Sequence, residues 1–446
     1  MSTTPWLRGS RQIELLSVFS PLSMTVFLYT PLLLLYAVTD RSVFAGEFTS
    51  RKALGWSGMA YFGLALTCFA VGAVYAQRKW RSTPRRSYDE QLTLASKRRS
   101  IAVILEGALL LSIAAYAVWF GIGVWRAGGP AQFIHIWRTD PFHLKIGILA
   151  TQPGITTLVQ LAVACVPLAF ALGFVRRGSV LRALVFVAIG LGVLRAFFFS
   201  ERLALVELLV PLLFLLLAPR RFTIPRIVLY AVVLLTALML FFAASELRRT
   251  YVYTGNASAS QVTTRFFGYY LTSVNNGMAV IEHYPAATPF YWSGQFYWLF
   301  PGVRDLRLDE VPALGTVSLR YADAFNVDPA SFWPQAFADQ GLNYEFNVFT
   351  APGFLAADYG WLGLLAVFLL GVISGRLYLM VKASRFHRAL YSVWLVGLFE
   401  FMRILYFTNT RTFPVYLVFF AVYLALRVPV RHNVRALRGR ADTAYG

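Results

Sequence analysis

Charged residues interrupt the long apolar stretch 184–218, and they are the first candidates for chemistry. Arg195 and Glu207 lie six residues on either side of Glu201. Two antiparallel helices joined near residue 200 would hold them at similar depth, either as a structural ion pair or as part of a polar site. Glu201 and Arg202 have no obvious local partner except each other, which favours a functional role over a solvated turn.

A second cluster follows the apolar segment 227–245. Its sequence, SELRRTY, places Glu246 just before the adjacent arginines Arg248 and Arg249. Guanidinium groups bind phosphate through bidentate, charge-assisted hydrogen bonds. A neighbouring carboxylate is suited to accept a proton from a hydroxyl group. The alternative is that these are interfacial charges at the end of a membrane helix.

The acid Asp358 stands at the start of another apolar segment, in NVFTAPGFLAADYGWLGLL (347–365). It would either cap the following helix, where its charge suits the helix dipole, or lie at the rim of a polar cavity. Glu400 and Arg403 are three residues apart, which predicts a structural pair on one helical face. Arg411, in the short turn TNTRTF, is a candidate for the third wall of the same cavity.

Composition indicates the elements that must position these side chains. The chain has 446 residues, of which 58% are hydrophobic and only 14% charged, and its mean hydropathy is +0.58. These values are typical of an all-α polytopic membrane protein. We expect about ten spans, at 15–39, 53–77, 101–125, 152–175, 183–199, 203–218, 227–245, 361–381, 389–407 and 413–426.

Basic clusters follow every second predicted span. Together with Arg8 and Arg11, these clusters hold 24 of the 41 Lys and Arg residues. The positive-inside rule therefore predicts that both termini are cytoplasmic, and it explains the net charge of +20 without nucleic acid. The expected organisation is 1–245 with the first seven spans, 246–360 as one large outer loop domain, 361–426 with the last three spans, and 427–446 as a basic cytoplasmic tail.

The pair of spans within 184–218 is short. Each helix has about 17 residues and a length of ~25 Å, less than a ~30 Å hydrocarbon core. The turn that contains Glu201 and Arg202 is therefore expected at the floor of an outward-facing cavity. The chain carries no Walker-type loop, HExxH motif or Cys-His cluster, so we expect neither metal nor cofactor. The cysteines Cys68 and Cys165 lie in apolar spans and are expected to be small core residues.

Three stretches resemble the polytopic oligosaccharide repeat-unit polymerases of the Wzy type, which include O-antigen polymerases. NVFTAPGFLAADYGWLGLLAVFLLGVISGRLY (347–378) is similar to that family's Asn/Thr and Asp-aromatic-Gly signature before a late span. The SER turn at 200–202 is similar to the family's Ser-Arg turn, although FFFSER lacks the small residue often found there. The segment SELRRTY…RFFGYYLTSVNN resembles the opening of the family's large periplasmic loop.

The resemblance implies a membrane-embedded glycosyltransferase of the GT-C kind in a bacterial inner membrane, facing the periplasm. Such enzymes move a growing glycan from its undecaprenyl diphosphate to the non-reducing end of a new lipid-linked unit. They use no nucleotide sugar or metal, and a chain-length-regulating co-polymerase is a possible partner. The expected substrate-binding residues are Arg195, Arg202, Arg248, Arg249, Arg411, Asn347 and Tyr270, and the acids expected to supply the base are Asp358, Glu201 and Glu246.

Three other classes fit parts of the sequence. A flippase or transporter of lipid-linked sugars would carry polar groups at mid-bilayer and on both sides, whereas the charges here gather toward one side. A membrane acyltransferase usually has a catalytic His in a helix, and no predicted span contains one. An O-antigen-type ligase shares the general fold of the polymerases, and the sequence alone separates the two poorly.

Overall fold

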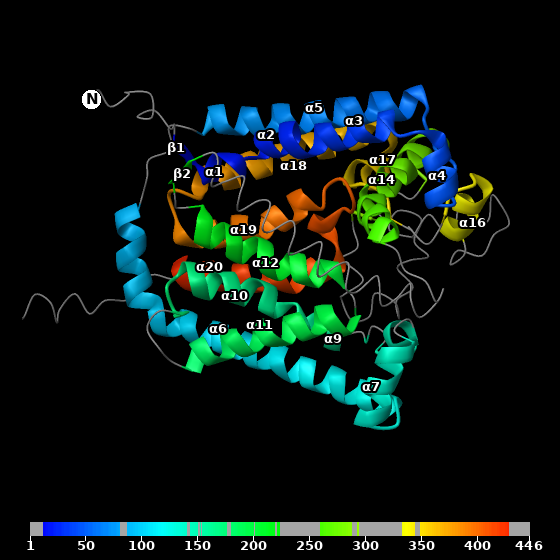
Figure 1. Ribbon diagram of the computed structural model, residues 1–446. Helices are drawn as coiled ribbons and strands as arrows, with labels where there is room; N and C mark the ends of the chain where they lie inside the picture. The colour runs from blue at the N-terminus through cyan, green and yellow to red at the C-terminus, as the bar shows by residue number, and fades with distance from the viewer. Residues whose placement is uncertain are drawn as a thin grey trace, which may run out of the picture.

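The computed structural model describes an almost entirely helical protein (Figure 1). It describes residues 12–80, 87–140, 143–149, 152, 154–175, 180–199, 201–218, 221–223, 259–287, 292–293, 332–343 and 348–427. The predicted span 227–245, the arginine cluster at 246–249 and Asn347 lie outside these residues, as does the tail beyond Arg427. The predictions made for them are therefore not examined by the structure.

Five helices are long and apolar enough to cross a membrane in the described part of the chain, so the protein is a multi-pass membrane protein. Ten spans were expected, and that number is not confirmed. The five are Pro21–Val38, which combines α2 (Pro21–Met24), η2 (Thr25–Tyr29) and α3 (Thr30–Val38); α5 (Trp56–Lys79); Ser96–Arg126 of α6 (Ser87–Arg126); Val180–Phe198 of α11 (Val180–Phe199); and Ala351–Met380, which combines α17 (Ala351–Tyr359), η8 (Gly360–Leu362) and α18 (Gly363–Met380).

Shorter helices complete the bundle. They are α1 (Leu15–Val18), α9 (Ile155–Val159), α10 (Leu161–Ala171), α12 (Arg202–Leu217), α19 (Arg385–Phe399) and α20 (Phe413–Arg427). A second group lies toward one end of the bundle: α4 (Arg41–Glu47), α7 (Pro130–Thr139), η3 (Leu144–Ile148), α14 (Ala259–His283), α16 (Phe332–Asp339), η9 (Tyr406–Thr408) and η10 (Thr410–Thr412). The only strands in the described residues, β1 (Gln12–Glu14) and β2 (Arg221–Thr223), pair antiparallel with Ile13 opposite Phe222.

The long helices lie side by side, and the two ends of the bundle differ (Figure 1). One end, here called the loop end, carries α4, α7, α14, α16 and α17, at the right of the figure. The opposite end, here called the basic end, carries β1, β2 and the charged helix termini, among them Arg78 and Lys79 of α5 and Arg427 of α20. Which side of the membrane each end faces stays a prediction.

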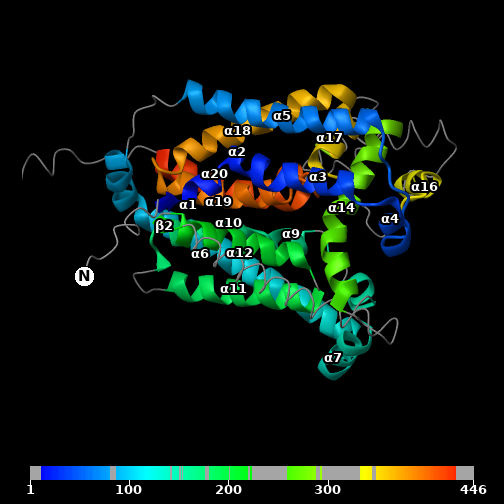
Figure 2. The same cartoon turned by 45° about the horizontal axis from the view of Figure 1, so that its top comes forward.

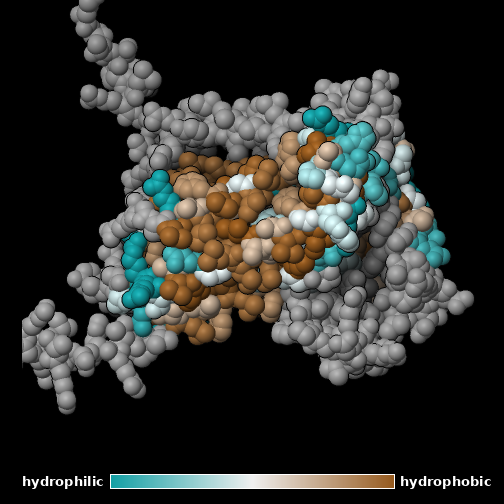
Figure 3. All heavy atoms as spheres, turned by 90° about the horizontal axis from the view of Figure 1, so that it is seen from below, coloured by the Kyte–Doolittle hydropathy of each residue, from teal (hydrophilic) through white to brown (hydrophobic). Residues whose placement is uncertain are grey.

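Apolar residues form a band across the visible face of the bundle, between these two ends (Figure 3). Hydrophilic residues lie at both edges of the band. Large apolar side chains are also exposed on other membrane helices, for example Val38 of α3 and Leu362 of η8, which are 78% and 77% exposed. In water such a surface would be costly, whereas in a bilayer it faces hydrocarbon. Both cysteines are free and Cys165 is buried in the core, as expected for small core residues.

Glycines bring α5 and α18 into direct backbone contact. A Cβ atom at Gly371 would lie 2.2 Å from the Phe69 carbonyl oxygen, and one at Gly375 would lie 2.5 Å from that of Ala73. The two glycines are four residues apart on α18, the spacing of the small-residue motifs that let membrane helices pack closely. Any larger side chain at these positions must separate the two helices.

The helix α14 crosses the loop end of the bundle (Figure 2). Its residues 271–281 are all buried. Asn275 holds it in place, because its Oδ1 accepts the Ala53 backbone N–H at 2.7 Å and its Nδ2 donates to the Arg51 carbonyl at 2.9 Å. The helix runs from Ala259 to His283, within the segment expected to form the large outer loop domain. The buried amide thus fixes the outer helix to the connection between α4 and α5.

We predict that Gly375→Leu destabilises the protein by about 1–3 kcal/mol or more, because the new side chain overpacks the contact between α5 and α18. The measurement is thermal unfolding of the purified protein in detergent. The matched control is Gly63→Leu on α5, where an added Cβ meets nothing within 4 Å. Equal melting temperatures for the two variants would contradict the role of the close contact.

Candidate functional site

The connection between α19 and α20 is the centre of the candidate site. The sequence predicted a span over 389–407, but α19 ends at Phe399 and the chain continues through turns to Phe413. The connection is nevertheless buried, with Phe401, Tyr406 and Thr412 each no more than 2% exposed. Irregular backbone at membrane depth is tolerated where other protein groups satisfy it. Here, for example, the Phe401 carbonyl accepts the Ala351 N–H at 2.8 Å.

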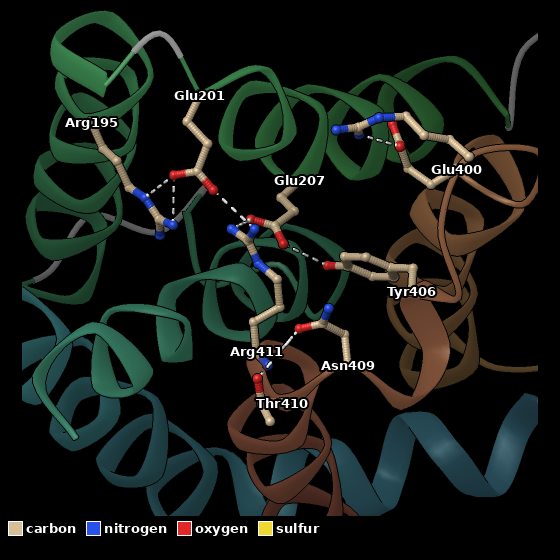
Figure 4. Close-up of polar contacts among 9 residues, drawn as sticks. Arg195, Glu201, Glu207, Glu400, Tyr406, Asn409, Thr410 and Arg411 are labelled. Atoms are coloured by element: carbon tan, nitrogen blue, oxygen red, sulfur yellow. Dashed lines mark hydrogen bonds and ion pairs between the residues drawn. The ribbon is translucent and has the colours of Figure 1, made fainter. Parts of the chain in front are cut away.

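Two arginines and two carboxylates meet beside this connection (Figure 4). Glu201 lies in the turn between α11 and α12, and its Oε2 is 2.7 Å from Arg195 Nη2 of α11. Its other oxygen is 2.9 Å from Arg411 Nη1, contributed by η10. Arg411 also reaches Glu207 of α12, with 2.9 Å between Nη2 and Oε2. These four residues are called here the arginine–glutamate network.

The network corrects one prediction about pairing. The sequence suggested that Arg195 and Glu207 pair with each other and that Glu201 has only Arg202 nearby. The structure instead pairs Arg195 with Glu201 and Glu207 with Arg411. The reason is that Arg411, which is distant in sequence, supplies a positive charge to Glu207. Arg195 therefore pairs with Glu201 instead. The side chain of Arg202 lies outside the described atoms, although its backbone begins α12.

Two neutral side chains complete the network. Tyr406 of η9 donates its hydroxyl hydrogen to Glu207 Oε1 at 2.9 Å. Gln160, at the break between α9 and α10, accepts hydrogen bonds from Arg195 Nη1 at 2.7 Å and Arg411 Nη2 at 3.2 Å when its amide oxygen faces the arginines. Sequence reasoning missed both residues. An amide in the interior of the apolar segment 152–175 was a usable signal, because polar groups in spans usually have a partner.

Burial and charge set the chemistry of Glu201. Burial alone would raise the pKa of this carboxyl, but the nearby guanidinium groups of Arg195 and Arg411 outweigh it and hold the pKa at about 2. The depressed pKa means that the carboxylate stays ionised at neutral pH, and its contribution to stability is lost only as the pH falls toward 2. A carboxylate this acidic is a weak proton acceptor, so Glu201 is better suited to orient arginines.

The network is partly accessible. The side chains of Glu201 and Arg411 keep 20% and 18% of their surface, whereas Glu207 keeps 2%. Arg411 Nε is buried and has no hydrogen-bond partner in the described residues. Arg411 therefore combines a reachable guanidinium with an unused donor. An anion that enters beside Glu201 would meet this residue first.

A small cavity lies on the inner side of the network. Its volume is about 30 Å³, and it is lined by residues of α6, α10, α11 and α12 that include Tyr116, Arg195 and Glu207. This is room for about two water molecules, and it is too small for a sugar ring. A ligand of that size therefore cannot reach the network through this cavity.

A second ion pair lies in the same connection. Glu400 and Arg403 are joined at 2.6 Å, as predicted, but past the end of α19 and not on its face. The Arg403 guanidinium also lies over the Tyr269 ring, 5.6 Å from its centroid. Tyr270, predicted to bind substrate, is near enough to Arg403 to interact with it electrostatically. The structure thus brings Tyr270 to this second pair, where α14 covers the connection.

Asp358 anchors a turn of the outer loop. It lies in the last turn of α17, and the N-cap of that helix is Thr350, so the prediction that Asp358 caps a helix N-terminus is wrong. The physical reason is that the helix already begins at Ala351, whereas hydropathy predicted that the span begins at 361. Both Asp358 oxygens instead accept backbone N–H groups, from Trp292 at 3.2 Å and Ser293 at 2.7 Å.

The anchored turn connects Asp358 to the network. The Trp292 carbonyl accepts a hydrogen bond from Thr408 Oγ1 at 3.0 Å. Thr408 belongs to η9, the same short helix that contributes Tyr406 to Glu207. Hydrogen bonds and one turn of η9 therefore connect Asp358 to Glu207 and Arg411. Asp358 thus helps to position the connection between α19 and α20.

Comparison with known proteins gives no match: no protein-family model, no curated protein and no solved structure is similar to this chain. Within the described residues there is also no group of three or more His, Cys, Asp or Glu that could hold a metal ion.

We predict strong coupling between Glu207 and Arg411. Glu207→Gln and Arg411→Gln should each destabilise the protein by about 3–5 kcal/mol, because each leaves the buried network with one uncompensated charge. The double variant should cost less than the sum of the two. The measurement is a double-mutant cycle from thermal unfolding. Glu106→Gln is the control, because Glu106 also lies in an apolar helix but has no ion-pair partner in the described residues. Additive losses would contradict the pairing.

A second prediction separates the Asp358 anchor from helix capping. Asp358→Asn replaces one acceptor oxygen by an NH2 group, so one of the Trp292 and Ser293 amides loses its partner. Hydrogen exchange at those amides should accelerate at least tenfold, while α17 keeps its protection. Thr350→Ala is the matched control: it removes the N-cap, costs about 1 kcal/mol, and should leave the turn unchanged. Equal exchange in the two variants would show that Asp358 does not hold the turn.

Proposed function

We propose that this protein is a polysaccharide polymerase that acts on lipid-linked oligosaccharides. It would transfer the growing glycan from undecaprenyl diphosphate to the non-reducing end of a new lipid-linked unit, in a bacterial inner membrane and facing the periplasm. The observation that carries the proposal is the convergence of Arg195 and Arg411, with Glu201, at the loop end of short apolar helices. The motif resemblance supports the same activity.

The proposed reaction exchanges one glycosidic bond for another. The bond between the donor sugar's anomeric carbon and the diphosphate oxygen breaks, and the diphosphate leaves with the electron pair. The acceptor hydroxyl oxygen bonds to the anomeric carbon and gives its proton to a base. The arginines would neutralise the leaving diphosphate, because charge-assisted donors stabilise charge that develops in the transition state.

The surroundings of each candidate residue indicate its proposed role. Arg411 and Arg195 are proposed to bind the diphosphate, with Arg202, Arg248 and Arg249 as additional cations. Glu201 is proposed to hold the arginines, since its low pKa makes it a poor base. Both Asp358 oxygens already accept N–H groups, which leaves Glu246 as the acid with the strongest case for the base.

We predict that the purified protein in nanodiscs, given lipid-diphosphate-linked repeat units and no other enzyme, produces a ladder of longer lipid-linked glycans. Arg411→Ala should lower the rate about 10²–10³-fold, the usual cost of losing one such donor. Arg411→Lys keeps the charge but cannot form two parallel hydrogen bonds, so its rate should lie between those of the wild type and Arg411→Ala. Arg138→Ala, an exposed arginine of α7, is the control and should keep the full rate.

The outcome distinguishes the alternatives. Unchanged substrate that moves between leaflets would indicate a flippase instead. Transfer of the glycan to a lipid A-type acceptor, with no ladder, would indicate a ligase. If a well-folded Arg411→Lys variant and Arg138→Ala polymerise equally well, Arg411 is not part of the diphosphate site.

A further inference from the structure

A second candidate site lies at the opposite, basic end of the bundle. A groove of about 710 Å³ opens on the surface of α5. Its floor is apolar, and its rim carries two cations; the lining residues are Ala70, Val71, Val74, Tyr75, Arg78 and Lys79. Val71 is 53% exposed, so the floor faces outward and not into the core. The groove therefore opens where the apolar band meets the basic end.

A third cation joins this rim from the neighbouring helix. Arg376 of α18 lies over the Trp80 ring, 5.1 Å from its centroid. Lys79 Nζ lies 5.3 Å from the same centroid and 3.1 Å from the Tyr75 hydroxyl oxygen. The glycine contact between α5 and α18 holds the two helices close enough for this cluster to form. Trp80 thus lies between cations from two helices.

These cations have no acidic counter-ion among the described side chains. Within the described residues no carboxylate lies within ion-pair distance of Arg78, Lys79 or Arg376, and all three side chains are exposed. At the loop end, by contrast, Arg195, Arg403 and Arg411 are each paired with an acid. Three uncompensated charges beside an apolar groove match a ligand with an anionic head and an apolar tail.

We propose that this groove binds one anionic phospholipid of the leaflet at the basic end. Its phosphate would contact Arg78, Lys79 and Arg376, and an acyl chain would lie along Val71 and Val74. The volume falls within the range of small-molecule sites. A free phosphate ion would leave the apolar floor uncovered, so the lipid is the better occupant. The proposal is independent of the reaction at the loop end.

Native mass spectrometry of the delipidated, purified protein tests the proposal. Phosphatidylglycerol should bind at least tenfold more tightly than phosphatidylcholine with the same acyl chains. The variant Arg78→Gln/Lys79→Gln/Arg376→Gln should weaken phosphatidylglycerol binding on the order of 100-fold, since each cation near a membrane surface contributes about fivefold. Added inorganic phosphate should not displace the lipid.

Two further variants make the test specific. Lys97→Gln/Arg99→Gln/Arg182→Gln removes three charges from α6 and α11 at the same end and should leave the affinity unchanged. Val71→Trp keeps all the cations but fills the groove, and it should also weaken binding. If the control triple loses as much affinity as the groove triple, or if both lipids bind equally, the site does not exist. Displacement by phosphate alone would also overturn it.

Discussion

A charge in an apolar interior must have an opposite charge beside it, and this constraint determines how the two halves of the chain meet. Among the described side chains, the α11–α12 pair contributes one arginine and two carboxylates, so it cannot neutralise itself. Arg411, more than 200 residues later in the chain, supplies the missing positive charge. Removing one partner from such a set costs several kcal/mol. The C-terminal helices are therefore tied to the central ones by electrostatics as well as by apolar packing.

The same requirement explains the irregular connection between α19 and α20. A continuous helix through this region would not present Tyr406 and Arg411 to Glu207 together. The chain instead makes two short helical turns, and neighbours such as Ala351 and Tyr416 donate hydrogen bonds to carbonyl groups of the connection. Outer elements then pack onto the connection: α14 brings Tyr269 over Arg403, and the turn at Trp292 joins it to Asp358. The loop end is thus organised around one buried, irregular segment.

The sequence predicts much of this arrangement but not its partners. Hydropathy and charge identify Arg195, Glu201, Glu207 and Arg411 as unusual. The short stretch between basic loops predicts two short helices; α12 has only 16 residues, whereas α11 has 20. Pairing is different, because it depends on helix rotation and on contacts between distant segments. No Gly or Pro follows Phe399 to mark the end of α19, which depends on tertiary contacts. The place of Asp358 late in its helix does have a local signal, because Thr350 and Pro352 are suited to the start of a helix at Ala351.

A paired network also limits which anions it can bind. Before a ligand can take both guanidinium groups, it must compete with Glu201 and Glu207, which already hold them. A monoanion carries the same charge as a carboxylate and would not readily replace one. A diphosphate presents more charge and several acceptor oxygens to the same donors. After transfer, the displaced carboxylates remain close by and compete for the arginines again. In the proposed reaction the acids thus favour release of the lipid diphosphate, so that tight binding of the leaving group does not trap the product.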